Sequence, residues 1–491
     1  MSPEAEGFLH LSSFASTAPG GGAFSLTSLT HNPAGDTGTI NISGSDIEMK
    51  LLDRLQERQK LDADLFIHRM FLTQQPVMLA GYKSLIDLPH TLMLLQQQAQ
   101  NAIAAERPLF ALGSGIGDCI SPTEELKVIE AMSEGNLIIL SESSDLCIKI
   151  VPISRTLSRA IEAPTTENVI RGSVSAFNED LDTNIGLIKK HVHSEKLRTQ
   201  SYRFEKGQRR QAILLYMEGQ TNPSFLNALK RRIESNLGNN IPNLQALNKL
   251  LGFPVWTLIS RFNTTELPEN AAYALEKGKV VLFLDRFPFA IILPSMITDM
   301  FAVANDRNFP LFFMITMRLL RTIGVLANML MPGLYVALVS VNPDVLRIEL
   351  ALSIASSRVG VPYPAIVETL LLLLVLELIL EASIRLPKTI GPTITMVGGI
   401  ILGQAVVNAK LVSNILIIIL AATTIASFTV VGFHNSIFIR ISKYLILILS
   451  ALYGVLGLFA GVVVVCVYLA SVNTFGIPYL YQPKARENSD G

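Results

Sequence analysis

The sequence is poor in charged residues and in cysteine, and both shortages exclude classes of protein. Only 16% of the 491 residues are charged, whereas 49% are hydrophobic, which is unusual for a soluble protein of this length. The three cysteines are too few for a disulfide framework, lack metal-site spacing, and are expected to be buried thiols. Lys plus Arg and Asp plus Glu both number 40, so the balance of charge does not indicate a nucleic-acid partner.

Patterns typical of catalysis and metal binding are also missing. The histidines are scattered, and no spacing typical of a zinc site or an activated nucleophile occurs. Residues 113–118 are glycine-rich but fit neither the dinucleotide nor the P-loop fingerprint, so we interpret them as a flexible loop. The sequence therefore predicts no enzyme, no cofactor and no bound metal.

The first 45 residues carry little that could fold or direct secretion. Residues 1–10 contain acids instead of the basic and apolar regions of a cleavable signal peptide. Residues 11–45 are rich in Ser, Thr, Gly and Pro and have few large apolar side chains to offset the entropy of ordering. We therefore predict a disordered tail over residues 1–45.

Residues 46–305 have soluble composition and are predicted to form two small α/β subdomains, 46–160 and 161–305. Short apolar runs indicate buried strands, and apolar periodicity with capping signals indicates the helices between them. Strands are predicted at 65–72, 77–80, 109–112, 137–140, 146–153, 199–204, 212–217, 280–284 and 290–293, the last two as a hairpin. Helices are predicted at 46–60, 88–105, 121–132, 177–191, 224–235 and 242–251.

Beyond Pro310 the sequence becomes largely apolar. A membrane span needs about 20 apolar residues, so 306–480 are predicted to form an all-α polytopic membrane domain of four to five transmembrane helices, with a short polar tail at 481–491. The apolar stretches are 322–341, 365–384, 393–409, 412–431 and 444–470. Residues 346–358 predict a short amphipathic helix, ended by the break at 360–364, that lies in the interface or re-enters the membrane.

The cations near these stretches predict an orientation. If every stretch spans, six fall on the side of the N-terminal region: Arg318, Arg321, Arg385, Lys388, Arg440 and Lys443. Three fall on the other side: Arg347, Arg358 and Lys410. By the positive-inside rule, the N-terminal region is expected to be cytoplasmic.

Several ordered motifs resemble the GerA family, the A subunits of bacterial spore germinant receptors. The resemblance covers about residues 170–480. Its motifs lie at 265–269, 278–285, 332–338, 349–355, 360–365, 381–387, 390–391, 403–405, 426–428 and 475–480. One departure is Arg286, which follows Asp285 where the family usually has glycine.

The resemblance implies an A subunit in the spore inner membrane that acts in nutrient-triggered germination. Such a subunit would assemble with a transporter-like B subunit that senses the nutrient and a lipoprotein C subunit, and would self-associate into a ring that conducts ions. A family member that releases ions downstream without sensing nutrient is one alternative. A secondary transporter and a non-conducting scaffold are others, although we find no internal repeat of the kind transporters usually show.

Three carboxylates in the apolar region are the sharpest candidate site residues: Glu368, Glu377 and Glu381. An ionised carboxylate in hydrocarbon costs about 3 kcal/mol on insertion scales. These groups therefore need water, a cation, or a partner such as Arg318 or Arg321. Lining of a pore and structural pairing are both open interpretations.

Two further features of the apolar region carry hypotheses. Ser357 and Val361 border or occupy the break after the amphipathic helix, where an apolar ring would gate a pathway by dewetting. Gly399 and Gly403 form a G-x-x-x-G pattern that lets another helix approach closely, and Gln404 beside them could donate across that contact. Packing between helices is the expected role of this face, and membrane lipid is an expected partner of the whole apolar region.

Overall fold

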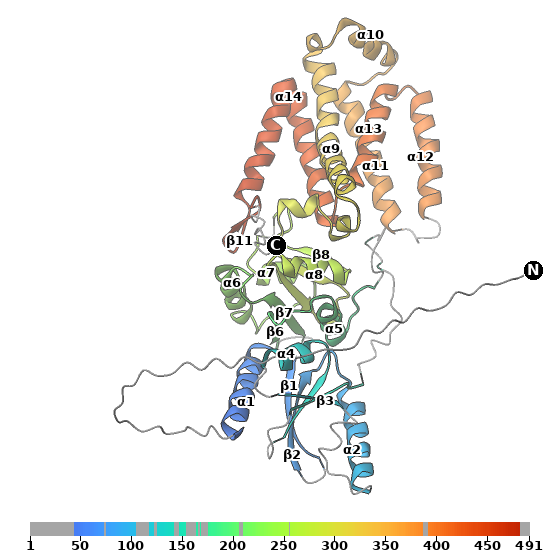
Figure 1. Cartoon of the computed structure of the whole chain (residues 1–491). Coiled ribbons are helices and arrows are strands. Elements are labelled where there is room, and N and C mark those ends of the chain that lie inside the picture. Colours follow the sequence, from blue (N-terminus) through green and yellow to red (C-terminus); the bar gives the residue numbers. More distant parts are fainter. Residues whose placement is uncertain are drawn as a thin grey trace, which may run out of the picture. The chain divides into compact units, whose positions relative to one another are not determined.

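The computed structural model describes residues 44–72, 75–104, 117–121, 125–141, 147–153, 164, 167, 175–205, 210–254, 256–385 and 391–481. The predicted tail before residue 44, the strand at 109–112, most of the glycine-rich loop and the polar tail after residue 481 lie outside these ranges. Two sheets with helices come first along the chain, and a helical region follows that ends in a two-stranded sheet of β11 (Asn473–Thr474) and β12 (Ile477–Pro478) (Figure 1). This order confirms the predicted α/β region followed by a helical region.

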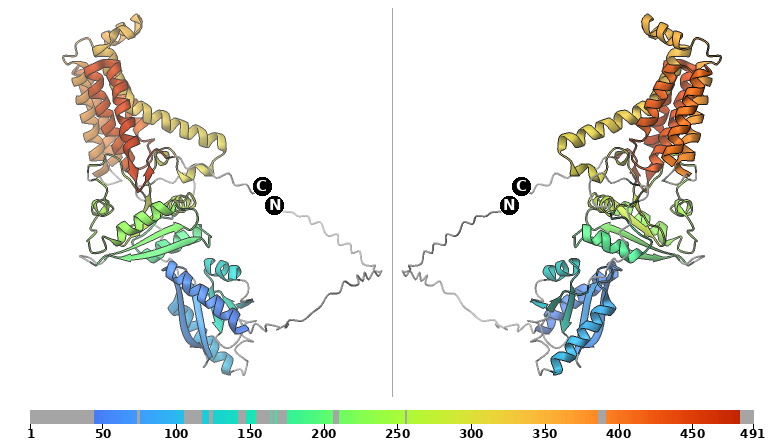
Figure 2. Two further views of the ribbon diagram at one scale, coloured as in Figure 1. Left: turned by 90° about the vertical axis from the view of Figure 1, so that its left-hand side faces the viewer. Right: turned by 90° about the vertical axis from the view of Figure 1, so that its right-hand side faces the viewer.

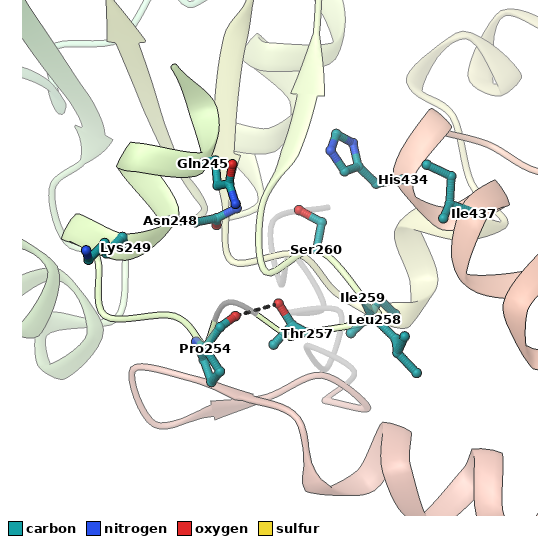
Figure 3. A pocket seen from close by; sticks show the side chains of 10 residues that line it. All are labelled: Gln245, Asn248, Lys249, Pro254, Thr257, Leu258, Ile259, Ser260, His434 and Ile437. Atoms are coloured by element: carbon teal, nitrogen blue, oxygen red, sulfur yellow. Dashed lines mark hydrogen bonds between the residues drawn. The ribbon is translucent and has the colours of Figure 1, made fainter. Parts of the chain in front are cut away.

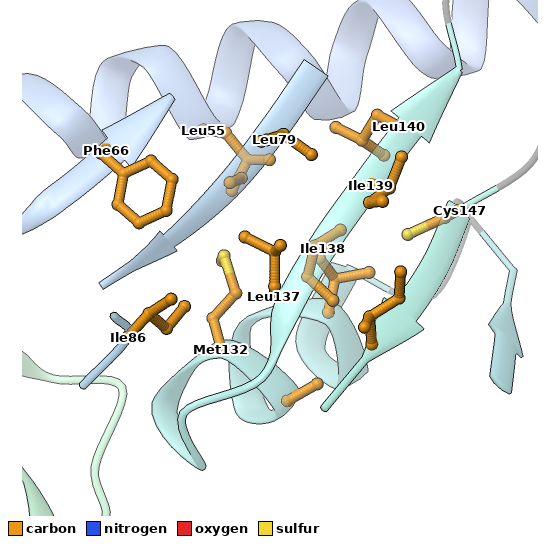
Figure 4. Packing of buried hydrophobic residues seen from close by; sticks show 14 of the residues in the cluster. Leu55, Phe66, Leu79, Ile86, Met132, Leu137, Ile138, Ile139, Leu140 and Cys147 are labelled. Atoms are coloured by element: carbon orange, nitrogen blue, oxygen red, sulfur yellow. The ribbon is translucent and has the colours of Figure 1, made fainter. Parts of the chain in front are cut away.

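The first sheet is antiparallel throughout, in the strand order β1-β2-β4-β5-β3. Its strands are β1 (Leu65–Leu72), β2 (Gln75–Tyr82), β3 (Gly117–Ile120), β4 (Leu137–Ser141) and β5 (Cys147–Ile150). The helices α1 (Gly44–Leu61), α2 (Leu88–Ala104) and α4 (Glu125–Ser133) contribute to its core. Leu55, Leu79 and Met132 meet there from a helix, a strand and a second helix (Figure 4).

The second sheet has the order β6-β7-β9-β10-β8 and is also antiparallel. Its strands are β6 (Leu197–Arg203), β7 (Gln211–Met217), β8 (Asn263–Thr265), β9 (Val280–Leu284) and β10 (Ala290–Leu293). Helices α5 (Leu181–His191) and α8 (Pro268–Glu276) share one core with the sheet, and α6 (Pro223–Glu234) and α7 (Leu244–Leu250) share another. Every residue of β9 is buried because both faces of the sheet are covered, which explains its unbroken apolar run.

Local sequence signals account for most of these boundaries. The predicted hairpin is confirmed, and Arg286 in its turn has φ of 67°, a left-handed conformation that favours glycine. Helix α5 begins at Leu181 and not at residue 177, because the Asp180 side chain caps it by accepting from the Thr183 N–H. The expectation of buried thiols is wrong for Cys119 and Cys466, which are exposed.

The helical region contains six helices among the residues described. They are α9 (Leu311–Val336), which continues into a π-helical turn at Ala337–Val341, α10 (Ile348–Ser357), α11 (Ala365–Arg385), α12 (Gly391–Asn408), α13 (Asn414–Ser427) and α14 (Phe433–Ser471). Two described stretches are long and apolar enough to cross a membrane, Leu311–Val341 and His434–Ser471. Each of the five predicted apolar stretches therefore contains a helix, although the one predicted at 412–431 is helical only over Asn414–Ser427.

The last of these stretches is folded back on itself at Gly454. This residue has φ of 62° and ψ of −138° inside α14, so the helix is broken there. The rings of Phe438 and Tyr468, 30 positions apart, stack with centroids 6.1 Å apart. The two arms consequently run side by side (Figure 2). The prediction of one crossing over 444–470 is wrong, since α14 is a helical hairpin.

The turn of this hairpin is closed by the end of α9. The N–H of Val455, the first residue after the turn, donates to Oδ1 of Asn342 at 3.0 Å. A Cβ at Gly454 would collide with the same Asn342 side chain and would approach Val341 at 2.9 Å. Glycine is therefore required at the turn both for its positive φ and for this close approach.

We predict that cysteines at positions 446 and 461 form a disulfide within one chain. The Cβ of Ile446 lies 3.4 Å from the position a Cβ would take at Gly461, near the disulfide value of about 3.8 Å. A straight helix would separate these positions by about 22 Å. The measurement is mass spectrometry of the oxidised double variant with the native cysteines replaced by alanine. The matched control pairs Ile446→Cys with Phe459→Cys, at an exposed position of the second arm; equal cross-linking of both pairs would contradict the hairpin.

Candidate functional site

Glu368 lies at a junction of three helices and is fully buried, with 0% of its surface exposed. It occupies the first turn of α11, and its Oε1 accepts the backbone N–H of Ser413, the N-cap of α13. Its Oε2 lies 3.5 Å from Nε of Arg358, which follows α10. A carboxylate is favoured at a helix N-terminus beside a guanidinium. In the single chain this acid therefore joins helices and does not face an open path.

The surroundings of Glu368 extend this polar junction. The hydroxyl of Tyr335 in α9 lies 2.9 Å from Oγ of Ser413, which also accepts the Leu416 N–H at 3.3 Å. Arg358 donates from Nη2 to the Tyr363 carbonyl at 3.1 Å. Four helices are thus connected through one buried carboxylate and the cap of α13.

Glu377 and Glu381 are paired as well, but with different partners. Glu377 contacts the guanidinium of Arg440 and lies 3.7 Å from Nζ of Lys443, both in the first arm of α14. Glu381 accepts from Arg385, one turn later in the same helix, at 2.6 Å. The pair at Glu381 is exposed, whereas the one at Glu377 joins two helices.

Neither Arg318 nor Arg321, given above as examples of a partner, pairs with these acids; other cations do. Arg321 binds Asp306 through both terminal nitrogens, at 2.6 and 2.9 Å, and Arg318 lies 3.7 Å from the same carboxylate. Burial of Asp306 opposes its ionisation, but the bonds from Arg321 and the Val303 N–H outweigh it and hold the pKa of Asp306 below its usual value. The ion pair of Arg321 with Asp306 therefore holds the first half of α9 against the preceding 3-10 turn, Ala304–Asn308.

The structure places Val361 in the turn after α10, where Gly360 has φ of 88°. Val361 and Ser357 are both half-buried, and the Ser357 hydroxyl donates to the Ile354 carbonyl. None of the side chains of α10 is buried, and Ile348, Leu350 and Leu352 are exposed. The predicted short helix and its break are therefore present, with an apolar surface uncovered in the single chain.

The G-x-x-x-G face of α12 is also uncovered in the single chain. Among the described residues, no heavy atom lies within 4 Å of where a Cβ at Gly399 or Gly403 would stand. Gln404 is exposed. These glycines thus make no close helix contact inside the described chain, and packing by them stays a prediction about another molecule.

One polar cluster was not expected from the sequence. Nζ of Lys189 in α5 lies 2.6 Å from Asp64 and 3.7 Å from Asp62, and all three side chains are buried. It also lies 3.3 Å from the centre of the Tyr82 ring. Burial alone would lower the pKa of Lys189, but the charges of Asp64 and Asp62 outweigh it and hold that pKa above its usual value.

The same cluster connects elements of both sheets. The Ser84 hydroxyl donates to Asp64 at 2.6 Å, and the Ala63 N–H donates to the carbonyl of Thr199 in β6 at 2.8 Å. From the sequence Lys189 resembles an ordinary cation in the last turn of a helix, and only the pair of aspartates hinted at a partner. Among the described residues, no three His, Cys, Asp or Glu side chains are grouped so that they could hold a metal ion.

These features define a class of protein with two antiparallel sheets followed by apolar helices, in which Glu368, Glu377 and Glu381 pair with cations of the same chain. The family model described as "Bacillus/Clostridium GerA spore germination protein" matches residues 53–490. The chain therefore belongs to the GerA family, as its motifs predicted, and the match begins well before residue 170.

Several individual proteins are also similar to the chain. Spore germination protein GerLA of Bacillus cereus is 33% identical over 79% of this chain and 78% of its own length. The uncharacterized membrane protein YfkQ of Bacillus subtilis (strain 168) is 29% identical over 73% of this chain and 70% of its own. The N-terminal domain of the A subunit of the Bacillus megaterium spore germinant receptor GerK3 aligns with a TM-score of 0.37 and 15% identity, covering 50% of this chain and 94% of that domain.

We predict a measurable energetic coupling between Glu368 and Arg358. Replacing either one by Gln leaves a charge without its partner. The free energy of unfolding lost in the double variant should therefore be smaller than the sum of the two single losses, by about 1–3 kcal/mol. Unfolding of the detergent-purified chain measures it. Glu381→Gln, which breaks an exposed pair, should change stability by less than about 1 kcal/mol. Purely additive losses would show that Arg358 does not stabilise Glu368.

Proposed function

We propose that the chain is the A subunit of a nutrient germinant receptor that triggers spore germination. Its membership of the GerA family over residues 53–490 carries this proposal. The relative GerLA, whose name assigns it to spore germination, matches along most of both chains. We propose in addition that this role is not enzymatic.

The proposed setting is the spore inner membrane, with the N-terminal region in the cytoplasm. Two stretches long and apolar enough to cross a membrane support membrane insertion, and so do the four further helices. Because α14 is folded as a hairpin, the elements available to cross the membrane would be its two arms and the helices α9, α11, α12 and α13. Labelling of Lys230 in intact spores by an impermeant amine reagent would contradict this orientation.

The proposed partners are a transporter-like B subunit, a lipoprotein C subunit and further copies of this chain in a ring. Apolar side chains on the first half of α9 support contacts beyond the single chain, because Leu311, Phe312 and Ile315 are all exposed. The open glycine face of α12 supports the same idea. Lipid or a neighbouring subunit would cover these surfaces.

Replacing Gly399 or Gly403 with Leu is expected to reduce cross-linked oligomer without unfolding the chain. The new side chain would enter open space within the chain, so a loss would report on contacts with another molecule. The measurement is cross-linking in native membranes with thermal stability beside it. Gly333→Leu serves as the opposite control, because a Cβ there meets Ser450 Oγ at 2.9 Å and should impair folding. Wild-type levels of oligomer in both α12 variants would show that this face is not part of the interface.

In the proposed mechanism, germinant binding shifts a closed ring toward an open one that conducts ions. We place the proposed constriction at Val361, beside the exposed apolar side of α10, because cations already pair with Glu368 and Glu377. An apolar constriction blocks ions by excluding water, so its width controls leakage.

Val361→Ala is therefore expected to widen the gate and cause ion leak without nutrient. Flux from liposomes containing the purified receptor measures this, with Val359→Ala, at an exposed neighbouring position, as the matched control. A second candidate function, a non-conducting scaffold, is favoured by the ion pairing of Glu368, Glu377 and Glu381. Absence of nutrient-dependent flux from the wild-type receptor, together with unchanged leak in Val361→Ala, would support the scaffold.

A further inference from the structure

The loop between α7 and β8 displays the single tryptophan of the sequence. Trp256 is 95% exposed, and Leu258 beside it is 43% exposed. Both ends of the loop are nevertheless anchored, because Phe253 and Ile259 are buried. The Thr257 hydroxyl donates to the Pro254 carbonyl at 3.0 Å and tightens the turn between them (Figure 3). Trp256 is therefore exposed between two buried ends of the loop.

Contacts on the far side of the turn place it beside the helical hairpin. Ile259 shares a buried cluster with Val325 of α9 and Phe438 of α14. The Leu258 N–H donates to the hydroxyl of Tyr468 at 2.8 Å, close to the end of the second arm. Arg261 donates to the Asn473 carbonyl just after that arm. The loop thus lies at the level where the second arm ends.

The surface of that arm is apolar up to the same level. Exposed side chains along it are Leu456, Phe459, Val463, Val464 and Val467, and the last directly precedes Tyr468. Residues 455–471 are about 25 Å long as a helix, slightly less than the hydrocarbon thickness of about 30 Å. An arm of this length that starts at one interface ends close to the other, so the loop would lie at a membrane–water boundary.

We propose that the loop is a membrane anchor, with Trp256 and Leu258 inserted at the boundary between lipid headgroups and acyl chains. Tryptophan is enriched at this depth because its ring is largely apolar and its N–H needs a polar partner. Exposed Lys249, which lines the pocket behind the loop (Figure 3), and half-buried Arg261 place cations where anionic lipid phosphates would lie. The inference rests on the proposed membrane placement of α14.

Fluorescence of the reconstituted full-length chain tests the anchor directly, because Trp256 is the only tryptophan. Vesicles of phosphatidylcholine and phosphatidylglycerol with acyl chains brominated near the headgroup are expected to quench most of its emission. Tail-end bromination should quench it far less, and the emission should be blue-shifted. Emission at the wavelength of tryptophan in water, quenched by iodide, would overturn the proposal. Blue-shifted emission without quenching by either lipid would also overturn it, since protein would then cover the loop.

Two variants in which the tryptophan is moved to another position distinguish failure of the loop anchor from failure of the membrane placement of α14. In a Trp256→Phe background, Phe459→Trp in the hairpin arm should be quenched by brominated lipid, whereas exposed Leu126→Trp in α4 should not be quenched. Failure of the Phe459→Trp signal would contradict the membrane placement of α14 itself. Quenching at Phe459→Trp with none at Trp256 would instead contradict only the loop anchor.

Discussion

The hydrogen bond from the Val455 N–H to the side chain of Asn342 closes the turn on which the helical region depends. A helix that breaks among apolar side chains exposes backbone groups that have no water to bind, and each such group costs several kcal/mol in hydrocarbon. Asn342 is available for this role because the π-helical turn at Ala337–Val341 ends α9 immediately before it. The end of one helix and the fold of another are consequently specified together.

The buried charges act in the same way on the remaining helices. Helices in an apolar medium gain little from hydrophobic burial against each other, so specific polar contacts decide which faces meet. Glu368 binds the start of α13 and the end of α10, and Glu377 binds the first arm of α14. Such pairs seldom add much net stability, but breaking one is costly, so they select one arrangement.

Prediction from sequence succeeded where one side chain or one short pattern decides the outcome. Apolar runs located β9 and β10, and the capping residue Asn222 located the start of α6. The hairpin was missed because an apolar run has the same hydropathy whether it is straight or folded, and the glycines at 454, 457 and 461 were the local signs. The need for a partner at Glu377 was predictable, but Arg440, 63 positions away, was not, because only the fold brings them together. The subdomain boundaries and the glycine contacts of α12 stay predictions.

The Lys189 cluster sets a condition on how the N-terminal half can be divided. Asp62 and Asp64 precede β1, whereas their cation comes from α5, which packs on the second sheet. A fragment ending before α5 would keep two neighbouring acids and lose the lysine, and one beginning at α5 would keep a lysine without its acids. Either piece would have to rehydrate groups that the whole chain keeps dry. The two sheets are therefore better regarded as one folding unit than as separable modules.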